Sequence, residues 1–175
     1  MTEIEFSRPL RVEPLSRDGL AQTIKASATE RAALAALNGL PAIARLEASF
    51  RISKWRRGVR VEGELSARVT QTCVVSLEPF EVDIEEPIDV KFLPIDADAP
   101  PRAEPVATAA DGEDEPDAIV DGKIDLGALA AEFLTLSLDP YPRKPGVAFE
   151  PPAEAVEADS PFERLRALAN RDEPD

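Results

Sequence analysis

Apolar and polar residues alternate most regularly in the middle of the chain. Residues 46–52 and 59–69 are apolar at every second position, and charged or polar side chains fill most of the positions between. A period of two places one face of a strand in the core and the other in water. The two runs flank SKWRRG, whose Gly58 suits a hairpin turn. The alternation resumes at 80–84 and, after a proline, at 88–92. We therefore expect an antiparallel sheet with a single buried face.

Shorter elements precede this sheet. Residues 3–12 mix apolar and polar side chains and suit an edge strand, where Pro9 need not donate a hydrogen bond. Ser27 and Glu30 have the spacing of a capping box, which predicts a helix from this point. The dipeptide Asn38-Gly39 predicts its end.

A second helix is predicted after residue 125. IVDGKI is a short strand or a tight turn around Asp121-Gly122, and Asp125 then has the position of a helix N-cap. A helical apolar face follows until Pro140, formed by Leu126, Leu129, Ala130, Phe133, Leu134 and Leu136. We expect this helix to pack against the apolar face of the sheet.

Two segments lack any apolar period. Residues 94–118 contain five prolines, eight acidic residues and one basic residue, so we interpret them as a flexible acidic insertion. Residues 147–175 form a proline- and acid-rich flexible tail that ends in a short amphipathic helix, PFERLRALANRDEPD. The prediction is α+β: a single domain over 1–146 with one twisted antiparallel sheet, either open or barrel-like, and two main helices.

Composition narrows the function classes. The chain has 175 residues and a net charge of −14, so it should repel nucleic acid except through a local basic patch or a basic protein partner. Histidine is absent, which removes imidazole catalysis and imidazole metal ligands. The sequence MTEIEFSRPL lacks the apolar region of a signal peptide, and no apolar run is long enough to span a bilayer. We expect a cytoplasmic protein, not an enzyme, with no membrane partner, small-molecule substrate, cofactor or metal.

The only cysteine, Cys73, lies in TQTCVVSLEPF, with Ser76 where a second thiol of a C-x-x-C pair would stand. One thiol without imidazoles is a poor zinc site, and no basic residue lies nearby in the sequence to activate it. We interpret Cys73 as a small buried residue; a metal ligand and a reactive thiol are the alternatives. Glu85-Glu86 and the acidic run 111–117 are interpreted as solvated, with general acid catalysis or cation binding as the alternative.

Two basic and aromatic groups are the candidate binding residues. The first surrounds the only tryptophan at the expected hairpin tip: Lys54, Trp55, Arg56, Arg57 and Arg60. These side chains could contact phosphates and stack on a base, or they could form a solvated turn. The second group follows the second predicted helix, between prolines: Tyr141, Arg143 and Lys144. This segment could dock a partner or simply form a rigid loop packed on the sheet.

The blocks VTQTCVVSLEPFEVDIEEPIDVKF and DGKIDLGALAAEFLTLSLDPYPRKPG, separated by an acidic insertion, resemble the YceD-like family. This is the bacterial ribosomal large-subunit (23S rRNA) accumulation protein family, and the resemblance covers about residues 5–146. Many members have C-x-x-C at the positions of Cys73 and Ser76, so any metal or disulfide held by that pair would not be inherited here.

The resemblance implies a role in ribosome biogenesis. Our first hypothesis is a non-catalytic factor supporting large-subunit assembly, an acidic adaptor that binds a basic ribosomal protein or a pre-ribosomal particle. The alternative is direct rRNA binding through residues 54–57. A third hypothesis is an enzyme that uses carboxylates or Cys73.

Overall fold

A computed structural model describes residues 5–13, 19–94 and 116–149. The chain divides into two units, Met1–Lys144 and Pro145–Asp175, and the fold below is that of the first. Most of the predicted acidic insertion and the predicted amphipathic helix of the tail lie outside the described residues.

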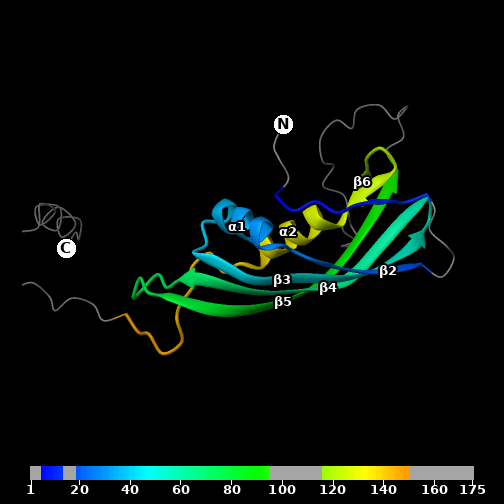
Figure 1. The fold of residues 1–175 in the computed structure, drawn as a ribbon. Coiled ribbons are helices and arrows are strands. Elements are labelled where there is room, and N and C mark those ends of the chain that lie inside the picture. The colour runs from blue at the N-terminus through cyan, green and yellow to red at the C-terminus, as the bar shows by residue number, and fades with distance from the viewer. Residues whose placement is uncertain (1–4, 14–18, 95–115, 150–175) are drawn as a thin grey trace, which may run out of the picture. The chain divides into compact units, whose positions relative to one another are not determined.

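A twisted five-stranded sheet forms the body of this unit (Figure 1). Its strands, in spatial order, are β2 (Leu20–Lys25), β3 (Ala42–Trp55), β4 (Gly58–Thr72), β5 (Pro79–Pro94) and β6 (Asp117–Ile119). The first four are antiparallel, and the long strands coincide with the alternating sequence runs. The side chains of the apolar positions lie on one face, as the period of two predicts.

The prediction of a single antiparallel sheet is wrong in two respects. β6 runs parallel to β5, pairing Phe92 with Asp117. The long segment between β5 and β6 makes this possible, because a parallel connection must return the chain to the same end of the sheet. In addition, β1 (Pro9–Arg11) pairs with β7 (Lys123–Asp125) in a separate two-stranded sheet, and the strands do not close into a barrel.

β5 is one continuous strand through Pro87, where the sequence pattern suggested an interruption. Pro87 lies opposite Glu64 of β4 and the register around it shows no shift. A proline has no N–H to donate, so this position fits only where the backbone nitrogen points away from β4. The strand tolerates Pro87 because that side of β5 is an edge.

The two helices cover the apolar face of the sheet (Figure 1). The capping box of α1 (Ala28–Leu37) is confirmed: the Ser27 side chain accepts from the Glu30 N–H, and the Glu30 side chain accepts from the Ser27 N–H. The predicted N-cap of α2 (Leu126–Ser137) is confirmed too, since Asp125 accepts from the N–H groups of Gly127 and Ala128. Asp125 also accepts from the Ser7 hydroxyl and the Arg8 N–H, which ties the N-terminal segment to the helix start.

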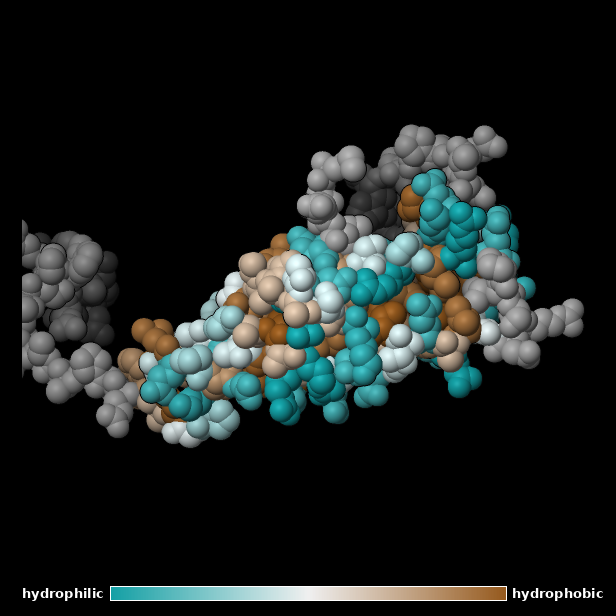
Figure 2. Space-filling model, in the orientation of Figure 1, coloured by the Kyte–Doolittle hydropathy of each residue, from teal (hydrophilic) through white to brown (hydrophobic). Residues whose placement is uncertain are grey.

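The core lies between the sheet and the helices. Its fully buried large side chains are Phe6, Leu34, Leu46, Ile52, Val59, Val61, Leu65, Val69, Leu126 and Leu134. On the other face of the sheet the strands carry mostly polar and charged side chains, and hydrophilic residues line the side away from the helices (Figure 2). No helix in the described ranges is long and apolar enough to cross a bilayer.

Candidate functional site

The predicted hairpin tip is a two-residue turn, Arg56–Arg57, between Trp55 of β3 and Gly58 of β4. Arg56 occupies the first central position with φ +51, in the left-handed region that a non-glycine residue seldom adopts. Gly58 was expected to serve the turn, but its role differs. A Cβ at Gly58 would lie 1.8 Å from the carbonyl oxygen of Phe92, so glycine is required there for close approach of β5.

Trp55 is half-buried and holds two cations against its ring. The guanidinium carbon of Arg56 lies 4.5 Å from the ring centroid, and the Nζ of Lys91 lies 5.4 Å from it. Contacts of this kind stabilise by about 0.5–1 kcal/mol at exposed sites. Sequence reasoning missed Lys91, because only the pairing of β4 with β5 brings it to the tip. The available signal was that Lys91 is the one basic residue in the acidic strand β5.

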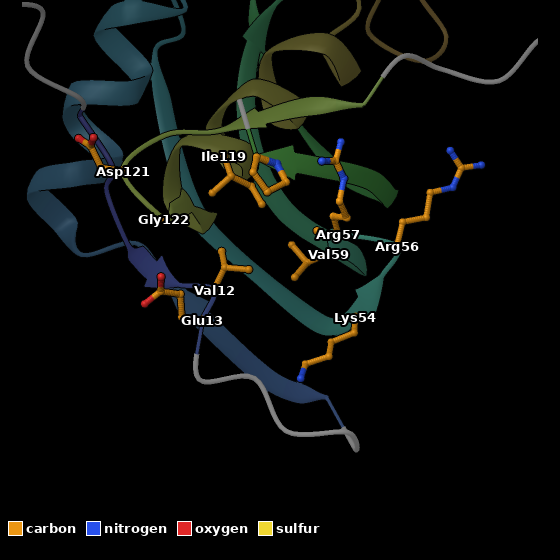
Figure 3. A pocket seen from close by; sticks show the side chains of 11 residues that line it. Val12, Glu13, Lys54, Arg56, Arg57, Val59, Ile119, Asp121 and Gly122 are labelled. Carbon is orange, nitrogen blue, oxygen red and sulfur yellow. The ribbon is translucent and has the colours of Figure 1, made fainter. Parts of the chain in front are cut away.

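A pocket of about 430 Å³ lies behind this tip (Figure 3). Its floor is apolar, formed by Val12, Val59 and Ile119. The acidic Glu13 and Asp121 lie at one side of the floor, and the hairpin cations lie at the other side (Figure 3).

The acidic side of this pocket is fixed by a tight turn. Asp121 and Gly122 both have positive φ, and the predicted tight turn there is confirmed. The Val12 N–H donates to the Gly122 carbonyl at 3.0 Å, which holds the segment after β1 against that turn. Lys54, Arg56 and Arg57 line the pocket, whereas Trp55 does not, so these three cations border a cavity that carries both signs of charge.

Arg60, the fifth residue of the predicted tip, is engaged elsewhere. Its guanidinium donates to both carboxylate oxygens of Asp89, at 2.7 and 2.6 Å, and lies 3.3 Å from Glu62. The hydrogen bonds to Asp89 raise the pKa of Arg60, and Arg60 in turn lowers the pKa of Asp89. The structure therefore places Arg60 in a charge-balanced pair on the open face of the sheet, beside the tip but not in its pocket.

The second predicted group lies at the opposite end of the sheet. The Val74 N–H, just beyond β4, donates to the Pro142 carbonyl at 2.9 Å, so residues 139–144 lie at the end of β4 remote from the hairpin tip. The 15 residues of β4 span about 46 Å at about 3.3 Å per residue, and this length separates the two groups. The two predicted groups therefore cannot form one compact site.

Within this second group, the side chains differ in their partners. Tyr141 is 73% exposed, and Arg143 is exposed as well. The Lys144 Nζ lies 2.7 Å from a carboxylate oxygen of Glu78, and this hydrogen bond raises the pKa of Lys144. Tyr141 and Arg143 are thus the members displayed to solvent, on a loop that the sheet anchors.

Cys73 lies close to this loop and is fully buried, as the alternation predicted. Its Sγ accepts from the N–H groups of Val75 and Ser76, each at 3.4 Å. Hydrogen bonds from Ser76 and from the Lys144 backbone lower the pKa of the thiol to about 6. The sequence showed no basic residue near Cys73, but the fold brings Lys144 beside it. Within the described ranges, no three His, Cys, Asp or Glu side chains are grouped so as to hold a metal ion.

Charge is distributed unevenly along the chain. The described residues carry 17 acidic and 15 basic side chains, a net charge of −2. The remaining segments carry 17 acidic and only 5 basic side chains, so they account for −12 of the total of −14. Segments 95–115 and 150–175 hold most of that excess. The basic hairpin tip thus belongs to a nearly neutral fold.

Comparison with known proteins gave one family. The model of the large ribosomal RNA subunit accumulation protein YceD matches residues 61–170, from β4 into the tail. No curated protein and no solved structure matched the chain.

Proposed function

The chain belongs to the YceD family of large ribosomal RNA subunit accumulation proteins, and we propose that it supports large-subunit assembly and 23S rRNA accumulation in the cytoplasm without catalysing a reaction. It does so by binding a basic ribosomal protein or a pre-ribosomal particle. The family match is the observation that carries the proposal, because it covers more than half of the chain.

The charge distribution supports a basic protein as the partner. Most of the negative charge of the chain is carried by segments 95–115 and 150–175, whereas the described residues are nearly neutral. Acidic segments of this kind attract basic proteins over distances of about a Debye length and raise the rate of encounter. Ribosomal proteins that are not yet assembled into a particle are the basic proteins that an assembly factor with acidic segments would bind.

Direct rRNA contact is the second candidate, and the hairpin tip favours it. Trp55 offers an aromatic surface, and the exposed cation of Arg56 packs on its ring. The exposed Lys54 precedes Trp55 in β3 and lines the neighbouring pocket. Stacking of a base on an aromatic side chain contributes about 1–3 kcal/mol, and cations beside it bind the backbone phosphates. The described residues are nearly neutral, so the negative charge that would repel RNA comes mainly from segments 95–115 and 150–175 and not from the residues around the tip.

Affinity capture of the tagged full-length chain with and without ribonuclease separates the two candidates. Binding to a basic ribosomal protein predicts that large-subunit proteins remain captured after ribonuclease treatment. Direct rRNA binding predicts that they are lost together with the RNA. Capture of no large-subunit component under either condition would contradict both.

A further inference from the structure

Among the described residues, one edge of β5 is unpaired over most of its length. β4 pairs with one side of the strand from Pro79 to Phe92, whereas β6 pairs with the other side only from Phe92 to Pro94. Within the described ranges, no strand pairs with that second side between Pro79 and Val90. An open edge of this length is a template on which another extended chain can pair.

The register shows which backbone groups face this edge. Pro79 and Pro87 are both odd-numbered residues of β5. Proline has no N–H to donate, so its nitrogen must point away from β4, and the odd-numbered residues of β5 therefore direct their backbone N–H groups to the outer edge. The β3–β4 hairpin gives the same orientation. Trp55 and Gly58 form the hydrogen-bonded pair that closes a two-residue turn, so the even-numbered residues of β4 form backbone hydrogen bonds with β3. The odd-numbered residues of β4 therefore form theirs with β5. The outward N–H groups along the unpaired part of β5 are therefore those of Glu81, Asp83, Glu85 and Asp89.

The side chains beside this edge differ between the two faces of the sheet. On the open face, exposed acidic residues recur at every second position: Glu81, Asp83, Glu85 and, beyond Pro87, Asp89. Asp83 and Asp89 pair with arginines of β4, whereas Glu81 and Glu85 lie opposite the uncharged Thr70 and Ser66. On the helix-covered face, Val82 and Val90 are only partly buried, although they pack against the core.

We propose that the open edge of β5 binds an extended segment of a basic partner protein, which pairs as an additional strand. The segment that fits alternates basic with apolar residues. Its basic side chains would lie beside Glu81 and Glu85, and its apolar side chains would complete the burial of Val82 and Val90. Backbone pairing supplies the affinity in this mode of recognition, and the alternate side chains supply the specificity.

Charge selects this occupant over two others. A second copy of the chain would bring its own acidic row against the same row, and like charges on neighbouring strands are destabilising. The sequence that precedes β6 is also acidic, with Asp111, Glu113, Asp114 and Glu115, and would be a like-charged neighbour. A basic segment alone complements the edge. Its identification with a ribosomal protein rests on the proposed function, whereas strand addition itself does not.

Amide hydrogen exchange on the full-length chain tests the proposal. The probe is a capped peptide of about ten residues in which Lys alternates with Val. Added peptide should slow exchange at the outward amides, chiefly those of Glu81, Asp83 and Glu85. The amides of Val82 and Ile84 already bond to β4 and should change little.

Two controls make the test specific. The double variant Glu81→Lys, Glu85→Lys should bind the peptide about tenfold more weakly or worse. The matched variant Glu64→Lys changes an exposed charge on the same face, one strand further in, and should bind almost as the wild type does. The same peptide with all its backbone nitrogens methylated has no N–H groups to donate to the edge and should lose binding.

Three results would overturn the proposal. Equal binding of the methylated peptide would indicate attraction of charges without strand addition. Slow hydrogen exchange of the outward β5 amides in the dilute protein without peptide would show that another segment of the same chain already covers the edge. Protection that rises with protein concentration alone would indicate a second copy. Because this assay uses purified protein and a synthetic peptide, its failure would leave the proposed role in rRNA accumulation standing.

Discussion

The Nζ of Lys91 on β5 lies 5.4 Å from the centre of the Trp55 ring on β3, across the intervening strand β4. Arg56 contacts the same ring at 4.5 Å. The only tryptophan of the chain is therefore contacted by cations from two parts of the sequence, which marks the hairpin tip as a basic and aromatic surface.

The double variant Lys54→Gln, Arg56→Gln should weaken binding to a single-stranded RNA oligonucleotide. If these cations neutralise phosphates, the slope of log affinity against log salt should become shallower by about 0.7 for each phosphate that is no longer neutralised. Lys25→Gln is the matched control, since Lys25 is an exposed cation that pairs with Glu47 away from the tip. Fluorescence anisotropy across a salt series measures both quantities. An unchanged slope would identify the tip as a solvated turn.

Arg56→Gly should separate folding from binding. Glycine adopts φ +51 without the penalty of about 1–2 kcal/mol that a side chain incurs there, but the variant also lacks the cation that packs on Trp55. We expect the free energy of unfolding in urea to stay the same or rise by up to about 1 kcal/mol, while RNA affinity falls. A clear decrease in the free energy of unfolding would show instead that the Arg56 side chain stabilises the fold.

Glu30 should make the fold sensitive to acid. The Arg8 guanidinium donates to both its oxygens, at 2.7 and 3.0 Å, and with the Ser27 N–H lowers its pKa from 4.5 to about 2. Because the folded pKa lies below the ordinary value, the stabilisation is present above about pH 4.5 and is lost as the pH falls through about 2. Urea unfolding from neutral to acid pH should show a smaller loss for Glu30→Gln than for the wild type, with Glu64→Gln as the control.

Cys73→Ala should affect the fold and spare the function. The substitution removes the acceptor for the N–H groups of Val75 and Ser76 and should lower the free energy of unfolding. Cys73→Ser keeps an acceptor and should recover part of that loss. Both variants should still restore rRNA levels in cells lacking the protein. A stable Cys73→Ala protein that fails to do so would favour the hypothesis of a reactive thiol.

Local signals in the sequence predicted the elements that depend on neighbouring residues. The Ser27–Glu30 capping box and the Asp125 N-cap are defined by spacings of a few positions, so the helix starts could be located without tertiary information. The long strands β3 and β4 followed from their alternation for the same reason.

Features that depend on distant pairing could not be predicted in this way. The parallel pairing of Phe92 with Asp117 spans the acidic segment, and nothing in either strand encodes its direction. Pro87 was ambiguous because its cost depends on whether its nitrogen faces a neighbouring strand. The contact of Lys91 with Trp55, and the separation of Trp55 from Tyr141 by the length of β4, follow from register alone.

The central claim is a role in the accumulation of large-subunit rRNA, and sucrose-gradient analysis of cells lacking the protein tests it most directly. We predict fewer free 50S particles and less 23S rRNA relative to 16S rRNA, with recovery when the full-length chain is supplied from a plasmid. An unchanged 50S peak together with an unchanged ratio of 23S to 16S rRNA would contradict this role.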